Sequence, residues 1–214
     1  MFGKNKTEKP KITDGKILEI NKIFDTFQGE GIYSGFPATF IRLAKCNLQC
    51  SFCDTEFEKY QELKIDNIVS KIHHKLVIIT GGEPLRQNIT PLCQKLITKN
   101  HLVQIESNGT LFLDLPKGVK ICCSPKISNG KYHQIRLDLL QKITFFKILI
   151  SKFQDGYDKI PDLGQEKYNI PVYLQPIDEY NSQKNQENKK LTLQLASQNN
   201  CRLSLQTHKI WNIE

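Results

Sequence analysis

Three cysteines, Cys46, Cys50 and Cys53, fall within a run of eight residues. Thiolates at this spacing can bind three irons of a four-iron cluster, which leaves the fourth iron without a protein ligand. Electron carriers normally supply four cysteines, whereas an iron with an open position can bind a small molecule. The spacing therefore indicates catalysis at a [4Fe-4S] cluster whose ligands are Cys46, Cys50 and Cys53.

Two simpler interpretations of the cysteines are less favoured. A structural zinc site usually has four ligands in two separated pairs, and the sequence has no second Cys-x-x-Cys or Cys/His pair. A disulfide framework is disfavoured because there is no signal peptide and the number of cysteines, seven, is odd. The other four we interpret as structural thiols of the core: Cys93, Cys122, Cys123 and Cys201.

Length and composition favour one domain. The chain has 214 residues and a net charge of +8. We expect residues 1–15, which are polar, to be a disordered extension and residues 16–214 to form a single domain. No apolar stretch approaches a membrane span and the thiols are unpaired, so we expect a cytoplasmic protein with no membrane partner. The lysines are spread along the chain, which indicates a solvated basic surface and no direct nucleic-acid partner.

Strand-like and helix-like segments alternate along the chain. We expect a helix over 65–74, with Asp66 as N-cap, and a polar loop over 181–190. Repeated strand-helix units of this length predict an α/β fold, an incomplete and abbreviated (β/α)6-type barrel. The other expected helices cover 89–100, 132–142, 156–168 and 188–199, and the expected strands cover 17–24, 38–43, 76–80, 102–106, 119–123, 144–150, 172–176 and 202–206.

The residues that could do chemistry follow these strands directly. Cys46 follows one strand, and Gly81 to Glu83 follow the next. Similar placements recur at Glu106 to Asn108, at Ser124 to Lys126 and at Gln175 to Asp178. The carboxyl ends of parallel strands meet on one face of an α/β barrel, so we expect one active site there.

Two motifs resemble the radical S-adenosylmethionine superfamily. They are Cys-x3-Cys-x2-Cys, with Phe52 before the last cysteine, and Gly81-Gly82-Glu83-Pro84 after the following strand. The open iron would chelate the methionine part of S-adenosylmethionine, and the glycines would let the backbone approach the same group closely.

A narrower resemblance, to the 7-carboxy-7-deazaguanine synthases, runs almost the full length. The motifs that carry it are Phe24-x-Thr26-Phe27-Gln28-Gly29-Glu30-Gly31, Gly35-x-Pro37, Phe40-Ile41-Arg42-Leu43, Cys53-Asp54-Thr55, Thr80-Gly81-Gly82-Glu83-Pro84-Leu85, Glu106-Ser107-Asn108-Gly109, Ser124-Pro125-Lys126, Gln175-Pro176 and Gln206-Thr207-His208-Lys209. The resemblance implies a carbon-nitrogen lyase of queuosine (7-deazapurine) biosynthesis, a tRNA-modification pathway. Its substrate would be 6-carboxy-5,6,7,8-tetrahydropterin, which a radical ring contraction would turn into 7-carboxy-7-deazaguanine and ammonia. It also implies Mg²⁺, a homodimer and a reducing donor such as flavodoxin or ferredoxin.

The same resemblance implies roles for individual residues. Arg42, a cation in an apolar strand, would bind the substrate carboxylate, with a structural salt bridge as the alternative. Thr55 would be the Mg²⁺ ligand, with a turn or N-cap residue as the alternative. No residue is assigned as a catalytic acid or base. The other substrate contacts would be Phe27, Gln28, Gly29, Glu30, Thr80, His208 and Glu214, and the S-adenosylmethionine contacts would be Phe52, Cys53, Asp54, Gly82, Ser124, Pro125, Lys126, Gln175, Pro176, Ile177 and Asp178.

Two rival functions remain open at this stage. An activase of a glycyl-radical enzyme shares the three-cysteine motif, but it gives no reason for Gln28, Glu30 and Arg42. A metal-stapled nucleic-acid-binding module would use the basic charge, and it predicts a colourless zinc protein with salt-sensitive RNA binding.

Overall fold

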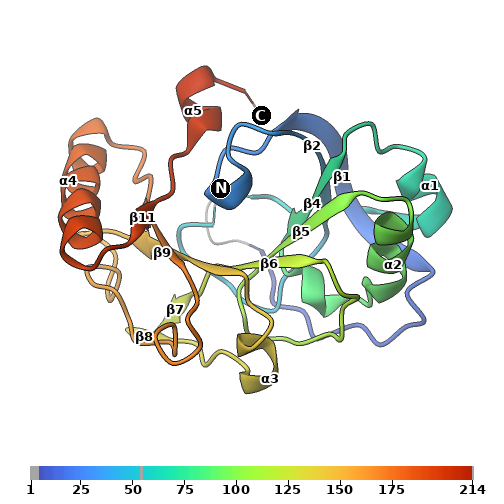
Figure 1. Cartoon of the computed structure of the whole chain (residues 1–214), viewed down its shortest axis with the longest axis horizontal. Helices are drawn as coiled ribbons and strands as arrows, with labels where there is room; N and C mark the ends of the chain where they lie inside the picture. Colours follow the sequence, from blue (N-terminus) through green and yellow to red (C-terminus); the bar gives the residue numbers. More distant parts are fainter. Residues whose placement is uncertain (1–4, 54, 214) are drawn as a thin grey trace.

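The computed structural model describes residues 5–53 and 55–213, and these residues form a curved sheet of nine strands (Figure 1). The two edge strands are β11 (Arg202–Leu203) and β3 (Gln61–Lys64). β3 pairs with β1 (Ile17–Phe27), and β1 is antiparallel to β2. The strand order is linear, so the sheet stays open, which confirms the predicted incomplete barrel. Six parallel strands make its centre, in the order β2 (Pro37–Leu43), β4 (Leu76–Gly81), β5 (Leu102–Ser107), β6 (Lys120–Cys123), β9 (Phe145–Ile150) and β10 (Val172–Pro176).

Side chains alternate between the two faces of the central strands, because successive residues of a strand point to opposite sides. The outer face packs its apolar residues against helices in one large core. The inner face is divided along the strands. Its lower layer is mostly apolar and consists of Ala38, Phe40, Leu76, Ile78, Cys122, Phe145 and Tyr173, with the buried Gln104 as a polar exception. Two residues beyond Phe40, Ile78 and Phe145, the inner positions are polar or charged: Arg42, Thr80 and Lys147. The sequence thus places a polar layer next to a mostly apolar one.

Helices cover the outer face. α1 (Ile65–Val69) and α2 (Thr90–Thr98) lie together at one end of the sheet and α4 (Ser182–Gln198) at the other (Figure 1). Buried Leu92, Cys93 and Leu96 seat α2 on the core. The smaller elements are η1 (Gly31–Tyr33), η2 (Pro84–Arg86), α3 (Leu137–Leu140), α5 (Thr207–Trp211) and the hairpin β7 (Ile127–Ser128) with β8 (Lys131–Tyr132).

Several predicted elements differ in the structure. The expected polar loop over 181–190 is helical, because the Asn181 side chain accepts a hydrogen bond from Lys184 N at 3.0 Å and caps α4. Residues 156–168, expected to be a helix, form turns. α1 ends at Val69, and its N-cap is Lys64, so Asp66 lies in the first turn.

The N-terminal segment departs from the predicted disorder. Residues 5–15 pack along the protein: Thr7 forms a bridge with Cys46, and Lys11 forms one with Gln87. Asn5, although polar and near the chain end, is only 7% exposed. These contacts are made to segments remote in sequence, and residues 1–4 of the expected extension lie outside the described residues. That residues 16–214 form one domain stays a prediction.

Among the described residues, no helix combines the length and the apolar character that crossing a bilayer requires.

Candidate active site

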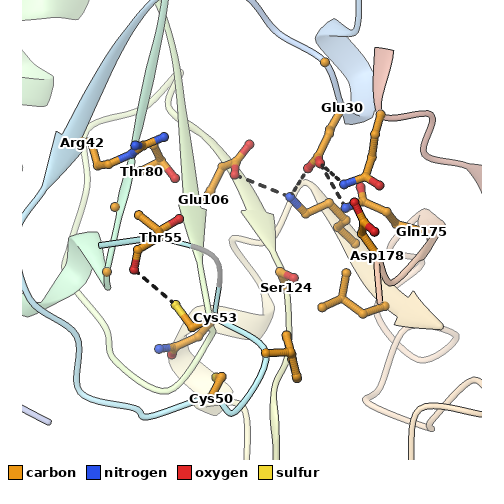
Figure 2. A pocket seen from close by; sticks show the side chains of 18 of the residues that line it. Glu30, Arg42, Cys50, Cys53, Thr55, Thr80, Glu106, Ser124, Gln175 and Asp178 are labelled. Carbon is orange, nitrogen blue, oxygen red and sulfur yellow. Dashed lines mark hydrogen bonds and ion pairs between the residues drawn. The ribbon is translucent and has the colours of Figure 1, made fainter. Parts of the chain in front are cut away.

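A cavity of about 360 Å³ opens at the carboxyl ends of the central strands. Figure 2 shows its two sides: Arg42 and Thr80 lie opposite Glu30 and Gln175, and the cysteine loop lies at one end. Every central strand contributes at least one lining residue, at its carboxyl end or just beyond it. The strand-end pattern of the sequence therefore gathers into one site.

The cysteine loop follows β2 and turns back under the cavity. Cys46 is 9% exposed, and its sulfur accepts a hydrogen bond from Leu48 N at 3.4 Å. Burial raises the pKa of the Cys46 thiol to about 12. Burial also raises the pKa of Cys50, where the Lys126 charge acts in the opposite direction. Free thiolates are therefore unfavourable here, and iron binding would have to displace the thiol protons.

The loop fits a four-iron cluster. The thiols of Cys46, Cys50 and Cys53 line the same cavity. Within residues 5–53 and 55–213, no three His, Cys, Asp or Glu side chains converge to share a single metal ion. A cubane needs no such convergence, because each thiolate binds a separate iron. Amide donors near the sulfurs, such as Asn108 Nδ2 at 4.0 Å from Cys46 Sγ, suit charged thiolates.

Gly81 and Gly82 bring the end of β4 against this loop. A Cβ on Gly82 would lie 1.9 Å from the Lys45 carbonyl oxygen, and Gly81 has a φ of +129°. Only glycine permits both features. The buried Glu83 carboxylate then accepts hydrogen bonds from Leu85 N at 3.0 Å, Ser107 Oγ at 2.9 Å and Asn108 N at 2.7 Å. Burial raises the pKa of Glu83, and these hydrogen bonds oppose the shift. The Gly-Gly-Glu motif thus joins the ends of β2, β4 and β5.

A buried lysine links two carboxylates on the far side of the cavity. Lys147 Nζ lies 2.5 Å from Glu30 Oε2 and 3.5 Å from Glu106 Oε2. Burial opposes the charge of Lys147, but Glu106 and Glu30 outweigh it and raise its pKa well above the usual value. Burial likewise opposes ionisation of Glu30, but Lys147 lowers its pKa below the usual value.

Three amides complete what we call the lysine-carboxylate cluster. Glu30 Oε1 accepts hydrogen bonds from Gln175 Nε2 at 3.0 Å and Gln206 Nε2 at 3.2 Å, and Glu106 Oε1 accepts one from Gln28 Nε2 at 3.1 Å. The cluster therefore presents fixed donors and acceptors to the cavity. Its members are Gln28, Glu30, Glu106, Lys147, Gln175 and Gln206.

Arg42 supplies a positive charge on the opposite wall. It is paired in register with Thr80 on β4, and its guanidinium lies 5.1 Å from the centre of the Phe24 ring. Among the described residues, no carboxylate forms an ion pair with it. The salt-bridge alternative is therefore not observed, and the cation remains available to an anionic ligand.

The C-terminal tail closes one side of the site. Thr207 N donates a hydrogen bond to Gly29 O at 3.1 Å, and a Cβ on Gly29 would lie 2.0 Å from His208 Nδ1. Lys209 Nζ lies 2.7 Å from Asp178 Oδ2. Burial opposes ionisation of Asp178, but the hydrogen bonds of its carboxylate, led by that from Lys209, lower its pKa to about 2. The tail is thereby held at the first residue and at the middle of α5.

The structure brings most of the predicted site residues to this cavity. Pro125 lies between two lining residues but does not line the cavity itself. Asp54 and Glu214 lie outside the described residues. The roles assigned to these positions stay predictions. The predicted residues that line the cavity are Phe27, Gln28, Gly29, Glu30, Arg42, Cys46, Cys50, Phe52, Cys53, Thr55, Thr80, Gly82, Ser124, Lys126, Gln175, Pro176, Ile177, Asp178 and His208.

Sequence reasoning missed several lining residues. Lys147 carries the same signal as Arg42, a single cation within an apolar strand, in Phe145–Ile150. Glu106 was noted at a strand end, but no role was assigned to it. Gln206 stood in the C-terminal motif, but no role was assigned to it. Asn5 carries no local signal, because only the tertiary fold brings it to the cavity.

No family model matches the chain. The 7-carboxy-7-deazaguanine synthase of Rickettsia prowazekii is 48% identical, over 100% of this chain and 96% of the relative. The chain belongs to the 7-carboxy-7-deazaguanine synthase family. The enzyme of the same name from Rhodospirillum rubrum is 35% identical over 100% of both chains.

This membership confirms the resemblance seen in the motifs. It confirms a radical S-adenosylmethionine lyase of queuosine biosynthesis, with a [4Fe-4S] cluster and S-adenosylmethionine as cofactors. The two rival functions are set aside. The crystal structure of QueE from Escherichia coli superposes with a TM-score of 0.74 at 24% identity, over 89% of this chain and 94% of that chain, which supports the fold.

Proposed function

We propose that this member of the 7-carboxy-7-deazaguanine synthase family converts 6-carboxy-5,6,7,8-tetrahydropterin into 7-carboxy-7-deazaguanine and ammonia. The observation that carries the proposal is the single cavity that joins a three-cysteine loop to a polar wall with an available cation, Arg42. A pterin with one carboxylate needs such a wall: donors and acceptors for the ring edge and a cation for the acid.

Cys46, Cys50 and Cys53 would hold the cluster, and when bound it would supply the electron that cleaves S-adenosylmethionine. The cofactor would lie along the strand ends that face this loop. Gly82 offers backbone without a side chain there. Lys126, whose Nζ donates to Ser124 O and Ser124 Oγ at 2.7 Å each, would fix the adjoining wall. Ser124 to Lys126 and Gln175 to Asp178 then flank the nucleoside.

Substrate recognition would fall to the two opposite walls. Arg42 would bind the carboxylate in a bidentate contact, with Thr80 beside it in the paired strand. Glu30, fixed by Lys147, would accept from the ring N–H groups, and Gln28 would add an amide. His208, packed on Gly29, would cover the bound ring.

We also propose one Mg²⁺ at Thr55, which lines the cavity beside Cys53. Magnesium often keeps several waters and binds few protein groups together with substrate oxygens, so one hydroxyl suffices. A homodimer and a reducing donor such as flavodoxin or ferredoxin complete the proposal. A cytoplasmic location stays a prediction from the sequence.

The test is an anaerobic incubation of the reconstituted protein with dithionite, S-adenosylmethionine, Mg²⁺ and carboxytetrahydropterin. Mass spectrometry should detect a deazapurine acid. Cys50→Ala should abolish the product, whereas Cys201→Ala, at a half-buried thiol that does not line the cavity, should retain it. Unchanged pterin with the parent protein, or equal turnover with Cys50→Ala, would contradict the proposal.

A further inference from the structure

Residues 5–11, which we call the N-terminal strap, run along the cysteine loop. Thr7 pairs with Cys46 in a parallel bridge, and Glu8 N donates a hydrogen bond to Cys46 O at 2.7 Å. Lys6 N donates to Glu58 Oε1 at 2.5 Å. The strap is thus hydrogen-bonded to the backbone of a predicted cluster ligand.

The far end of the strap is fixed by buried groups that do not line the cavity. Arg86 Nη1 donates to Lys9 O at 3.4 Å, and Lys11 N donates to Arg86 O at 2.7 Å. Lys11 Nζ lies 2.9 Å from Glu19 Oε1, and the buried Arg86 and Glu19 side chains form an ion pair. The path of the strap therefore does not depend on the side chain of residue 5.

Asn5 places an amide against the cluster loop. Its Nδ2 donates to Thr55 O at 2.9 Å and lies 3.8 Å from Cys53 Sγ, within hydrogen-bond reach of a sulfur. The side chain lines the cavity. An amide nitrogen carries two N–H groups, so one can bind the carbonyl while the other points to the sulfur.

We propose that Asn5 is a positioning residue that donates an N–H to the Cys53 thiolate of the loaded protein and stabilises the reduced cluster. The inference rests on the proposed cluster assignment. Reduction adds negative charge that is shared with the ligating sulfurs, and hydrogen bonds to those sulfurs are among the features that set the potential. The strap thereby makes the start of the chain part of the redox centre.

The experiment is a redox titration of reconstituted full-length protein, followed by electron paramagnetic resonance, with iron content measured on the same samples. Asn5→Ala removes both N–H groups, and Asn5→Asp keeps the shape but replaces the donor with an anion. At a fixed solution potential, we expect the ratio of reduced to oxidised cluster to fall about fivefold in Asn5→Ala, as for the loss of one hydrogen bond. Asn5→Asp should lower it further.

The matched control is Asn21→Ala. Asn21 Nδ2 also donates to a backbone carbonyl, Lys59 O at 2.7 Å, but Asn21 does not line the cavity. Its potential should equal that of the parent. Potentials of Asn5→Ala and Asn5→Asp that match the parent at full iron content would overturn the inference, and so would an equal shift in Asn21→Ala. A parent protein that binds no four-iron cluster would instead refute the proposed function.

Discussion

Replacement of Lys147 by methionine should convert the lysine-carboxylate cluster from a stabilising group into a destabilising one. Methionine keeps most of the length and the apolar stem but removes the charge between Glu30 and Glu106. Both carboxylates then face each other across a largely buried site without their common cation. The change therefore tests whether the ion pairs or the surrounding amides hold this wall together.

The size of the effect follows from burial. The exposed fraction of the side chain is 9% for Lys147, 14% for Glu30 and 19% for Glu106. Removal of one partner from a buried pair typically costs about 3–5 kcal/mol. Amide donors from Gln175, Gln206 and Gln28 remain, so we expect a loss near the lower limit, about 3 kcal/mol of unfolding free energy at neutral pH.

The pH dependence of this loss has a definite sign. In the parent, Lys147 outweighs burial and keeps the pKa of Glu30 low, so this contribution is present at neutral pH and is lost as the pH falls through that pKa. Without Lys147, burial raises the pKa of Glu30 above its unfolded value. The folded variant then binds more protons than the unfolded chain, and it becomes relatively less stable as the pH rises. The deficit should be largest near about pH 8 and shrink towards about pH 5.

The assay is urea denaturation of the cluster-free chain, followed by circular dichroism, across this pH range. Lys142→Met is the control, because Lys142 forms an exposed ion pair with Asp114 and should cost at most about 0.5 kcal/mol. Glu30→Gln in the Lys147→Met background should recover part of the loss. A deficit below about 1 kcal/mol, or one that grows as the pH falls, would refute this account of the cluster.

Three further changes test other parts of the site. Arg42→Lys should weaken pterin binding about tenfold or more, because the bidentate fork is lost, while S-adenosylmethionine binding measured on the same protein stays unchanged. Gly82→Ala should lower the iron content after reconstitution, since its Cβ would meet the Lys45 carbonyl; full iron content would refute the packing argument. Asn188→Ala should cost about 1–3 kcal/mol in urea denaturation, because the buried amide accepts from Lys152 N at 2.9 Å and donates to Ile177 O at 3.0 Å. Asn199→Ala, which removes an exposed hydrogen bond beyond the end of the same helix, should cost much less.

The central architecture could be predicted because local sequence patterns indicate it. Apolar runs mark the strands, and residues such as Cys46 and Gly82 follow them directly, so the site face of the sheet is visible in the sequence alone. Lys147 carried the same local signal as Arg42, and this signal was overlooked.

Other features depend on contacts between distant segments. The first part of α4, up to Lys190, looked like a loop because its residues are polar, and the cap at Asn181 sets the start of the helix. Asn5 looked disordered because its partners Cys53 and Thr55 lie about 50 residues away, a separation that no local pattern reports. The antiparallel direction of β1 is set by its pairing with β2 and not by its composition.

The stability of the fold and the substrate selectivity of the cavity depend on different layers of the inner face of the sheet. The apolar lower layer secures the strands, while the positions two residues further along decide what the cavity accepts. Exchanges at Arg42 and Thr80, which lie outside the lysine-carboxylate cluster, should therefore change which heterocyclic acids bind in the cavity. A directed-evolution library limited to these two positions would leave the buried ion pairs of Lys147 in place.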